Sequence, residues 1–241
     1  MKTVQLFSTC LIDSFYPNAG LSIVNILRKV GLEVEFPRGQ TCCGQPPYNA
    51  GLQVDARQIA EHMIKVFEDT RGDIVIPSGS CSHMIKVNYP ELFAEDEKWM
   101  PRAKALGERV FEFTQYLVDR LGISDLGARW AGTITYHPSC HTLRGMGIDR
   151  QPRLLLSHVE GAQIVELPNA EECCGFGGIF SLEHPELSAE LMERKIRSLE
   201  QSTSPTMVMA EAGCMLHITG GLHRQHKPHR VMHISEILDQ V

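Results

Sequence analysis

The chain has 241 residues, of which 43% are hydrophobic and 22% are charged, and its formal net charge is −6. This length and apolar content can fill one large domain or two small ones. The acidic balance argues against a nucleic-acid partner, because binding to phosphates needs clustered Lys and Arg. The first residues, MKTVQLFSTC, hold no apolar run of signal-peptide length, and no run of about 18 uncharged apolar residues occurs. We therefore expect a cytoplasmic protein that is not an integral membrane protein.

The first half of the chain alternates between strand and helix patterns. Short apolar or alternating runs predict strands over 4–7, 32–36, 73–77 and 109–113. Apolar residues at helical spacing predict helices over 23–30 and 60–67, with Gly31 and Gly72 as stop signals. Strands that alternate with helices at this length predict βαβ units and a mainly parallel sheet.

The second half repeats this alternation. GTITYHP at 132–138 reads as a strand, and apolar residues at helical spacing over 189–199 predict the corresponding helix. The strand-then-helix signal at 230–235 matches the one at 109–114. Between the halves, GISDLGARWAG at 122–132 is rich in glycine and has no sustained period. We therefore predict a first repeat over 1–125 and a second over 131–241.

Eight cysteines follow the same repeat. They occur in each half as a single residue, an adjacent pair and a single residue: Cys10, Cys42, Cys43 and Cys81, then Cys140, Cys173, Cys174 and Cys214. The intervals are 31 and 37 residues in the first set and 32 and 39 in the second. Because cytosolic thiols are kept reduced, this pattern indicates metal or redox chemistry rather than a disulfide framework.

The residues around the cysteines support an internal duplication. VEFP precedes the first CCG and VELP precedes the second at the same distance, while IVI before Cys81 matches MVM before Cys214. We therefore predict an α/β fold of two pseudo-symmetric Rossmann-like repeats, each a mainly parallel sheet flanked by helices.

The predicted topology brings the four thiols of each half together. Each cysteine position follows a strand, so the thiols are expected at the carboxyl edge of one sheet, where open α/β sheets bind ligands. Thiolates select zinc, Cu(I) or iron-sulfur clusters. The C-x2-4-C knuckles typical of structural zinc are absent, and adjacent cysteines on a glycine loop favour a multi-iron cluster. Zinc in one repeat, or redox-active disulfides at the two pairs, are the alternatives.

Glycines follow both cysteine pairs. Gly44, Gly175, Gly177 and Gly178 allow the backbone to approach the sulfurs, and their N–H groups can donate hydrogen bonds that raise the reduction potential of a cluster. CCGFGG superficially resembles a dinucleotide-binding fingerprint. However, the spacing G-x-G-x-x-G fails at Phe180, and no ribose-binding acid stands at the proper place.

These motifs together resemble the CCG cysteine-rich domain family, which includes the cysteine-rich component of heterodisulfide reductase and the iron-sulfur component of glycolate oxidase. GQPPYNAG, SGSC, YHPSC, CCGFGG, GCMLHI and VMHISEIL are most similar to its lactate utilization branch, across nearly the whole chain. The resemblance implies that the eight cysteines hold iron-sulfur clusters, [4Fe-4S] in type and up to one per repeat.

The resemblance also implies an electron-transfer subunit of an oxidoreductase complex that converts L-lactate to pyruvate without NAD. Its partners would be a ferredoxin-like iron-sulfur protein and a small accessory protein, and a glycolate-oxidising or heterodisulfide-reductase-like complex is the alternative. One departure concerns the last motif, which reads C-x-x-C in the heterodisulfide reductase. Met84 and His217 replace that final thiol here, so a five-thiolate cluster is in doubt, while four ligands per half still suffice for a [4Fe-4S] cluster.

Three histidines lie near the cysteines in the sequence. His217 occupies the place of a missing cysteine, but we expect it to be a helix residue packed under the loop. His137 and His141 flank Cys140 and could tune or protonate a cluster, or cap a turn. No Ser-His-Asp or Cys-His-Asn arrangement outranks the cluster interpretation, so we expect no residue of organic catalysis in this chain.

Overall fold

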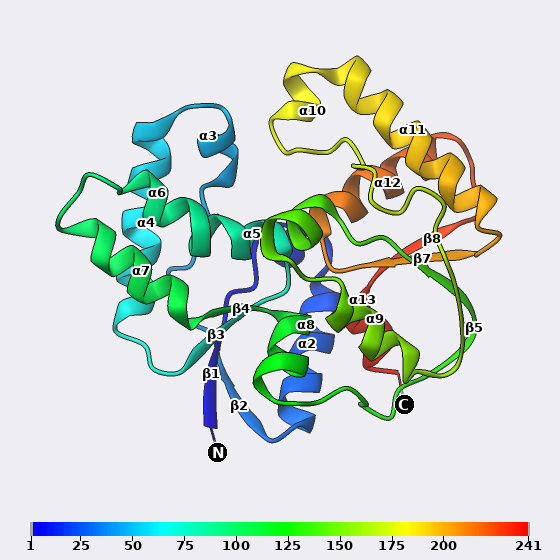
Figure 1. Ribbon diagram of the computed structural model, residues 1–241, viewed down its shortest axis with the longest axis horizontal. Coiled ribbons are helices and arrows are strands. Elements are labelled where there is room, and N and C mark those ends of the chain that lie inside the picture. The colour runs from blue at the N-terminus through cyan, green and yellow to red at the C-terminus, as the bar shows by residue number, and fades with distance from the viewer. Residues whose placement is uncertain (1, 241) are drawn as a thin grey trace.

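The structure is a computed structural model that describes residues 2–240, and it contains two four-stranded parallel sheets (Figure 1). The first sheet consists of β1 (Lys2–Leu6), β2 (Leu32–Glu35), β3 (Asp73–Ile76) and β4 (Val110–Glu112). The second consists of β5 (Arg129–Tyr136), β6 (Glu160–Val165), β7 (Thr206–Met209) and β8 (Arg230–His233). The strand orders, β2-β1-β3-β4 and β6-β5-β7-β8, are the same. The predicted α/β class with two parallel-sheet repeats is confirmed.

Helices cover both faces of each sheet. Between the sheets lie α2 (Pro17–Lys29), α8 (Phe113–Gln115), the π-helical turn η2 (Tyr116–Arg120), α9 (Arg150–Ser157) and α13 (Ile234–Leu238) (Figure 1). The outer face of the first sheet carries α3 (Gln45–Asn49), α4 (Gln53–Glu68), α6 (Tyr89–Leu92) and α7 (Trp99–Arg109). The outer face of the second carries α10 (Phe180–Glu183), α11 (Pro185–Gln201) and α12 (Ala212–Arg224). The other short segments follow strand ends: α1 (Cys10–Phe15), α5 (Gly79–His83), η1 (Met84–Asn88) and η3 (His141–Gly145).

One hydrophobic core joins the two sheets. Along β3, Val75 faces this shared core, whereas Ile74 and Ile76 face an outer core with α4 and α7. β7 repeats the arrangement, with Val208 in the shared core and both flanking methionines in an outer core with α11 and α12. Because both faces of these central strands are buried, the strands are continuously apolar rather than alternating.

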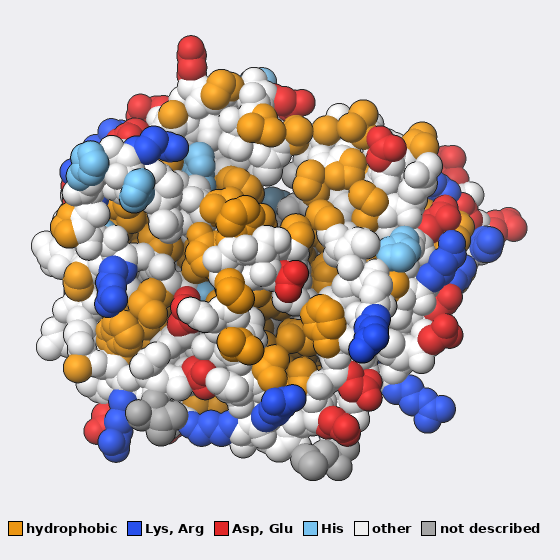
Figure 2. All heavy atoms as spheres, turned by 180° about the vertical axis from the view of Figure 1, so that it is seen from behind, with side chains coloured by type: hydrophobic (Ala, Val, Ile, Leu, Met, Phe, Trp, Pro, Cys, Tyr) orange, Lys and Arg blue, Asp and Glu red, His pale blue; other side chains and the backbone are white. Residues whose placement is uncertain are grey.

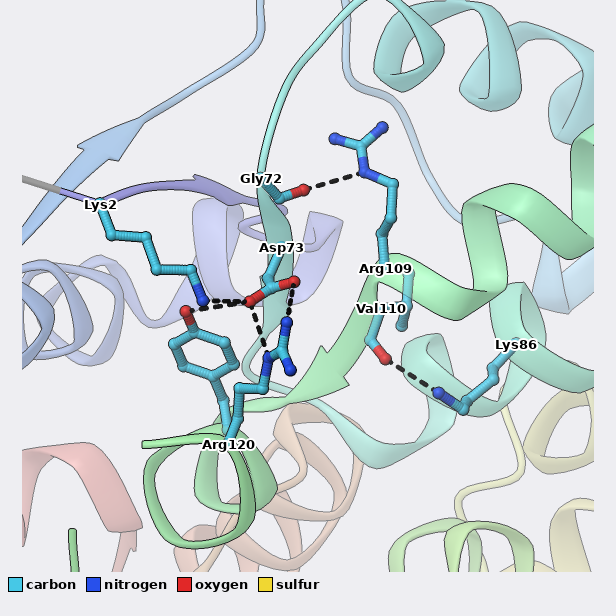
Figure 3. Close-up of polar contacts among 8 residues, drawn as sticks. Lys2, Gly72, Asp73, Lys86, Arg109, Val110 and Arg120 are labelled. Carbon is cyan, nitrogen blue, oxygen red and sulfur yellow. Dashed lines mark hydrogen bonds and ion pairs between the residues drawn. The ribbon is translucent and has the colours of Figure 1, made fainter. Parts of the chain in front are cut away.

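The amino edge of the first sheet carries charged groups (Figure 3). The Asp73 carboxylate, at the start of β3, accepts hydrogen bonds from Lys2 Nζ at 2.8 Å, Arg120 Nε at 3.1 Å and the Tyr116 hydroxyl at 3.4 Å. Burial alone would raise the pKa of Asp73, but hydrogen bonds from these two cations hold it below the ordinary value. Charge therefore gathers at the amino edge, whereas the opposite, carboxyl edge carries the thiols.

The face seen from behind is apolar in its middle. Figure 2 shows hydrophobic side chains gathered there, with most charged side chains around the margin. Over the described surface as a whole, the exposed large hydrophobic side chains include Phe15, Leu52, Val54 and Leu182. Among the described residues, no helix is both long enough and apolar enough to cross a membrane.

Candidate metal centre

The four thiols of the first half lie together at the carboxyl edge of their sheet. Cys10 begins α1 just after β1, the Cys42–Cys43 pair lies in the loop after β2, and Cys81 lies in α5 after β3. The Sγ atoms of Cys43 and Cys81 are 3.4 Å apart, and Cys42 lies within hydrogen-bonding distance of both Cys10 and Cys43. The convergence follows from the parallel order of the strands, whose carboxyl ends share one edge.

The second half repeats this arrangement. Cys140 follows β5, the Cys173–Cys174 pair follows β6, and Cys214 lies in the first turn of α12 after β7. The Sγ atoms of Cys174 and Cys214 are 3.0 Å apart, and Cys173 lies within hydrogen-bonding distance of both Cys140 and Cys174. All eight cysteines are free thiols.

Both groups of thiols open onto one cavity between the halves. This cavity has a volume of about 160 Å³ and is lined by all eight cysteines, together with residues that include Ser78, Gln45 and Glu211. Cys43, Cys81, Cys174 and Cys214 are buried, whereas the other four thiols are more accessible. The sequence predicts two sites but contains no signal that they face each other, because this depends on how the two sheets pack.

The glycine after each cysteine pair makes a tight turn. Gly44 and Gly175 have φ angles of 85° and 88°, in the left-handed region that favours glycine. A Cβ at Gly175 would lie 2.5 Å from the Ser188 carbonyl oxygen. The Gly175 N–H donates to Cys173 Sγ at 3.3 Å. For Gly175 the predicted hydrogen bond to a sulfur is confirmed, and Gly177 and Gly178 line the cavity nearby.

The first cysteine of each pair is the centre of its hydrogen-bonded group. Hydrogen bonds from the thiols of Cys10 and then Cys43 lower the pKa of Cys42 to about 3, and Cys140 and Cys174 lower that of Cys173 in the same way. The pKa of Cys10 is raised, chiefly because its proton is shared with Cys42. A thiolate that already draws protons from its neighbours is suited to a cation. Four free soft donors per half, with a backbone N–H directed at a sulfur, fit a thiolate-bound metal cluster.

The halves are joined beside the cavity by residues at equivalent positions of the repeat. Ser78 precedes Cys81 by three residues, as Glu211 precedes Cys214. The buried Glu211 carboxylate accepts hydrogen bonds from Ser78 Oγ at 3.0 Å, Ser80 N–H at 2.8 Å and Ser80 Oγ at 2.9 Å. These contacts hold the two thiol-bearing edges against each other.

Two of the three histidines lie away from the buried thiols, although His141 lines the cavity beside Cys140. His217 lies on α12, where its Nε2 is 3.2 Å from Ser188 Oγ, whose hydroxyl donates to the Gly175 carbonyl. It therefore packs under the loop, as the sequence predicts. His141 begins η3, with Nδ1 3.7 Å from Cys140 Sγ and Nε2 3.4 Å from Gln45 Nε2 of the first half.

His137 is the histidine that lies among the buried thiols. It directly follows β5 and is 1% exposed. One of its ring nitrogens and the sulfurs of Cys174 and Cys214 all lie within 4.8 Å of one another. Burial, and then the positive charge of Lys195, lower the pKa of His137 to about 3, so the ring is neutral. A group of this composition and spacing could hold a metal ion.

Comparison with known proteins agrees with this arrangement. The model of the cysteine-rich CCG domain matches residues 4–86 and 134–219, one segment in each of the two halves described above. Lactate utilization protein A of a Geobacillus species is 46% identical over 98% of this chain and 98% of its own length. The proteins of the same name from an Exiguobacterium species and from Bacillus subtilis are 44% and 43% identical, over 100% and 98% of this chain and 98% of their own lengths.

Likeness to solved structures is weak. A glutamate racemase from Francisella tularensis aligns with 99% of this chain and 78% of its own, at 12% identity and a TM-score of 0.37, which supports no inference. The duplicated match and the full-length relatives agree with the paired thiol groups in the structure. The chain belongs to the cysteine-rich CCG domain family.

Proposed function

We propose that this chain is an iron-sulfur electron-transfer subunit of an oxidoreductase complex that oxidises L-lactate to pyruvate in the cytoplasm. The full-length relatives named lactate utilization protein A support the substrate. The observation that carries the proposal is the single cavity lined by all eight free thiols. Such a site has many soft donors and is suited to holding metal and moving electrons rather than to organic catalysis.

Each half would hold one cluster, [4Fe-4S] in type. The ligands would be Cys10, Cys42, Cys43 and Cys81 in the first half and Cys140, Cys173, Cys174 and Cys214 in the second. A cluster of this type supplies reversible one-electron storage when bound. Zinc in one repeat is less well supported, because an adjacent cysteine pair suits several metal atoms better than one tetrahedral ion.

The protein surroundings would set the properties of these centres. The Gly175 N–H donates to the Cys173 sulfur, which favours the reduced, more negative state. The inner cysteines are shielded from water. Oxidation of lactate to pyruvate releases two electrons and two protons, and two one-electron centres on one cavity match the two electrons.

Partners complete the proposed complex. They would be a ferredoxin-like iron-sulfur protein and a small accessory protein, which exchange electrons with this chain. Nucleic acid is not expected among its partners, because the chain carries a net charge of −6.

Anaerobic purification followed by iron, sulfide and zinc analysis tests the proposal. We expect a brown protein with roughly eight iron and eight sulfide per chain and a paramagnetic signal on reduction. Adding L-lactate to the chain together with its partner proteins should reduce the clusters. A colourless protein with stoichiometric zinc would overturn the electron-transfer role, whereas loaded clusters that glycolate reduces and lactate does not would overturn only the substrate.

A further inference from the structure

We propose that His137 is an additional ligand of the metal centre in the second half, binding through Nε2. That centre would then have four sulfur donors and one nitrogen donor, whereas the first half has four sulfur donors alone. The inference rests on the proposed function in one respect, since it requires a metal centre at Cys140, Cys173, Cys174 and Cys214.

The hydrogen bonds of His137 determine which nitrogen is free. Nδ1 lies 3.2 Å from the carbonyl oxygen of Ala170. Because a carbonyl oxygen can only accept, Nδ1 must carry the ring proton and donate it. Nε2 is then the ring nitrogen left to bind a metal ion. This atom is buried and has no hydrogen-bond partner among residues 2–240.

The lone pair on Nε2 needs a positive partner. A ring nitrogen of His137 and the sulfurs of Cys174 and Cys214 lie within 4.8 Å of one another, and these sulfurs also present lone pairs once a metal has displaced their protons. A histidine that binds metal through Nε2 keeps one ring proton, on Nδ1, and the Ala170 carbonyl is placed to accept it. Metal is therefore the partner that satisfies the nitrogen and both sulfurs together.

Neighbouring residues hold the ring in this state. The Ala170 carbonyl accepts a second hydrogen bond from Lys195 Nζ at 3.1 Å, and Lys195 also donates to the Asn169 carbonyl at 2.8 Å. Lys195 is fully buried in α11. Histidine ligands in proteins commonly donate the non-ligating N–H to a carbonyl in this way, which orients the ring and fixes the tautomer. Lys195 and Ala170 are thus positioning residues for His137.

The first half lacks every part of this arrangement. Phe7 occupies the equivalent position after β1 and packs edge-on against Phe67 with the ring centroids 6.0 Å apart. Met63 takes the place of Lys195, since the buried residues of α4 and α11 follow the same spacing. A phenylalanine beside Cys43 and Cys81 shows that this position in the fold can be filled without a polar atom. The imidazole in the second half therefore has a role other than packing.

Pulsed electron paramagnetic resonance of the full chain tests the inference. Protein containing histidine labelled with ¹⁵N in the ring is loaded anaerobically with iron and sulfide and then reduced. We expect hyperfine coupling to a bound nitrogen in one of two cluster signals. His137→Phe should abolish this coupling while the chain still takes up iron in both halves, because four thiols remain. The matched control, His217→Phe, should retain the coupling, because His217 faces Ser188.

The outcomes separate the two proposals. Iron and sulfide uptake by wild-type protein without nitrogen coupling, or coupling that persists unchanged in His137→Phe, overturns the ligand role and leaves the proposed function standing. A wild-type chain that takes up no iron and sulfide overturns both. The wild-type spectrum needs no variant to fold, and His137→Asn replaces the phenylalanine variant if the bulkier ring prevents folding.

Discussion

The two halves share one strand order and one arrangement of thiols, but the surroundings of the thiols differ in polarity. In the first half Phe7 and Met63 pack beside the cysteines in an apolar outer core. In the second half His137 and Lys195 occupy the equivalent positions and are just as buried. The duplication has thus preserved the thiols, while the residues behind them have diverged. Two centres on one cavity would therefore differ in potential, because potential depends on the groups around the cluster.

A second difference lies at the ends of β4 and β8. Glu112, the last residue of β4, accepts hydrogen bonds from the N–H groups of Thr114 and Gln115, which lie in α8. His233 occupies the equivalent position in the second half, where its Nδ1 accepts from the N–H of Ser235. Both caps are fully buried. One repeat therefore caps its helix with an acid and the other with a base.

The largest effect is expected from removing the central cysteine of one half. Cys173→Ser removes the thiolate that contacts Cys140 and Cys174, so the second centre should be lost and the iron and sulfide content should fall by about half. Cys42→Ser is the matched variant for the first half and should give the same loss. Iron analysis with paramagnetic resonance of each variant checks this. Loss of both centres in either variant would contradict two separate centres.

The next largest effect concerns the contact between the halves. Gly79 in α5 packs against the second half, and a Cβ there would lie 2.0 Å from Thr142 Oγ1 and 2.8 Å from Thr142 Cα. Gly79→Ala should therefore lower the free energy of unfolding by about 3 kcal/mol, measured by urea unfolding of the metal-free protein. The control is Gly220→Ala in α12, where, apart from the neighbouring residues and backbone of the helix itself, no atom lies within 4 Å of the new Cβ. Equal stability of the two variants would contradict the close packing of the halves.

A smaller loss is expected when the polar link across the cavity is removed. Glu211→Ala leaves Ser78 Oγ and the Ser80 N–H without their acceptor and should lower the free energy of unfolding by about 2 kcal/mol. Glu190, in an exposed ion pair with Arg197, provides the control, since Glu190→Ala should cost less than about 0.5 kcal/mol. Matching losses in the same urea titration would mean that Glu211 does not stabilise the contact.

The two buried capping residues, Glu112 and His233, should make the stability of the protein depend on pH in opposite directions. The net change in stability is small because the two contributions offset each other. Burial raises the pKa of Glu112 from 4.5 to about 7, so its contribution to stability is present below pH 4.5 and is lost as pH rises to about 7. Burial lowers the pKa of His233 from 6.5 to about 4, so its contribution is present above pH 6.5 and is lost as pH falls to about 4.

Two variants distinguish the contributions of Glu112 and His233 to the pH dependence of stability. Relative to wild type, Glu112→Gln should gain stability as pH rises from 4.5 to about 7, because glutamine has no proton to lose. His233→Asn should gain stability relative to wild type as pH falls from 6.5 to about 4. Thermal unfolding of the metal-free protein at a series of pH values measures both differences. A constant difference across pH for either variant would show that its cap does not titrate.

Much of the fold follows from local patterns in the sequence. The apolar runs predict the strands to within a few residues, because both faces of β3 and β7 are buried and the runs are continuous. The helices predicted at 23–30 and 60–67 begin earlier, at Pro17 and Gln53, since their first turns have few buried residues to mark them. α12, with its two adjacent glycines, and the three π-helical turns carry no local signal that predicts them. The division into repeats over 1–125 and 131–241 remains a prediction.

By itself, the sequence determined the repeated pattern of the eight thiols and their convergence within each half, because parallel strands bring their carboxyl ends to one edge. Only the tertiary structure decided that the two edges meet in one cavity. Contacts such as Ser78 with Glu211 and Gly79 with Thr142 join positions that no periodicity relates. Tertiary packing also distinguished His137 from His141, which flank the same cysteine, because burial and the Ala170 carbonyl leave one nitrogen of His137 beside the sulfurs.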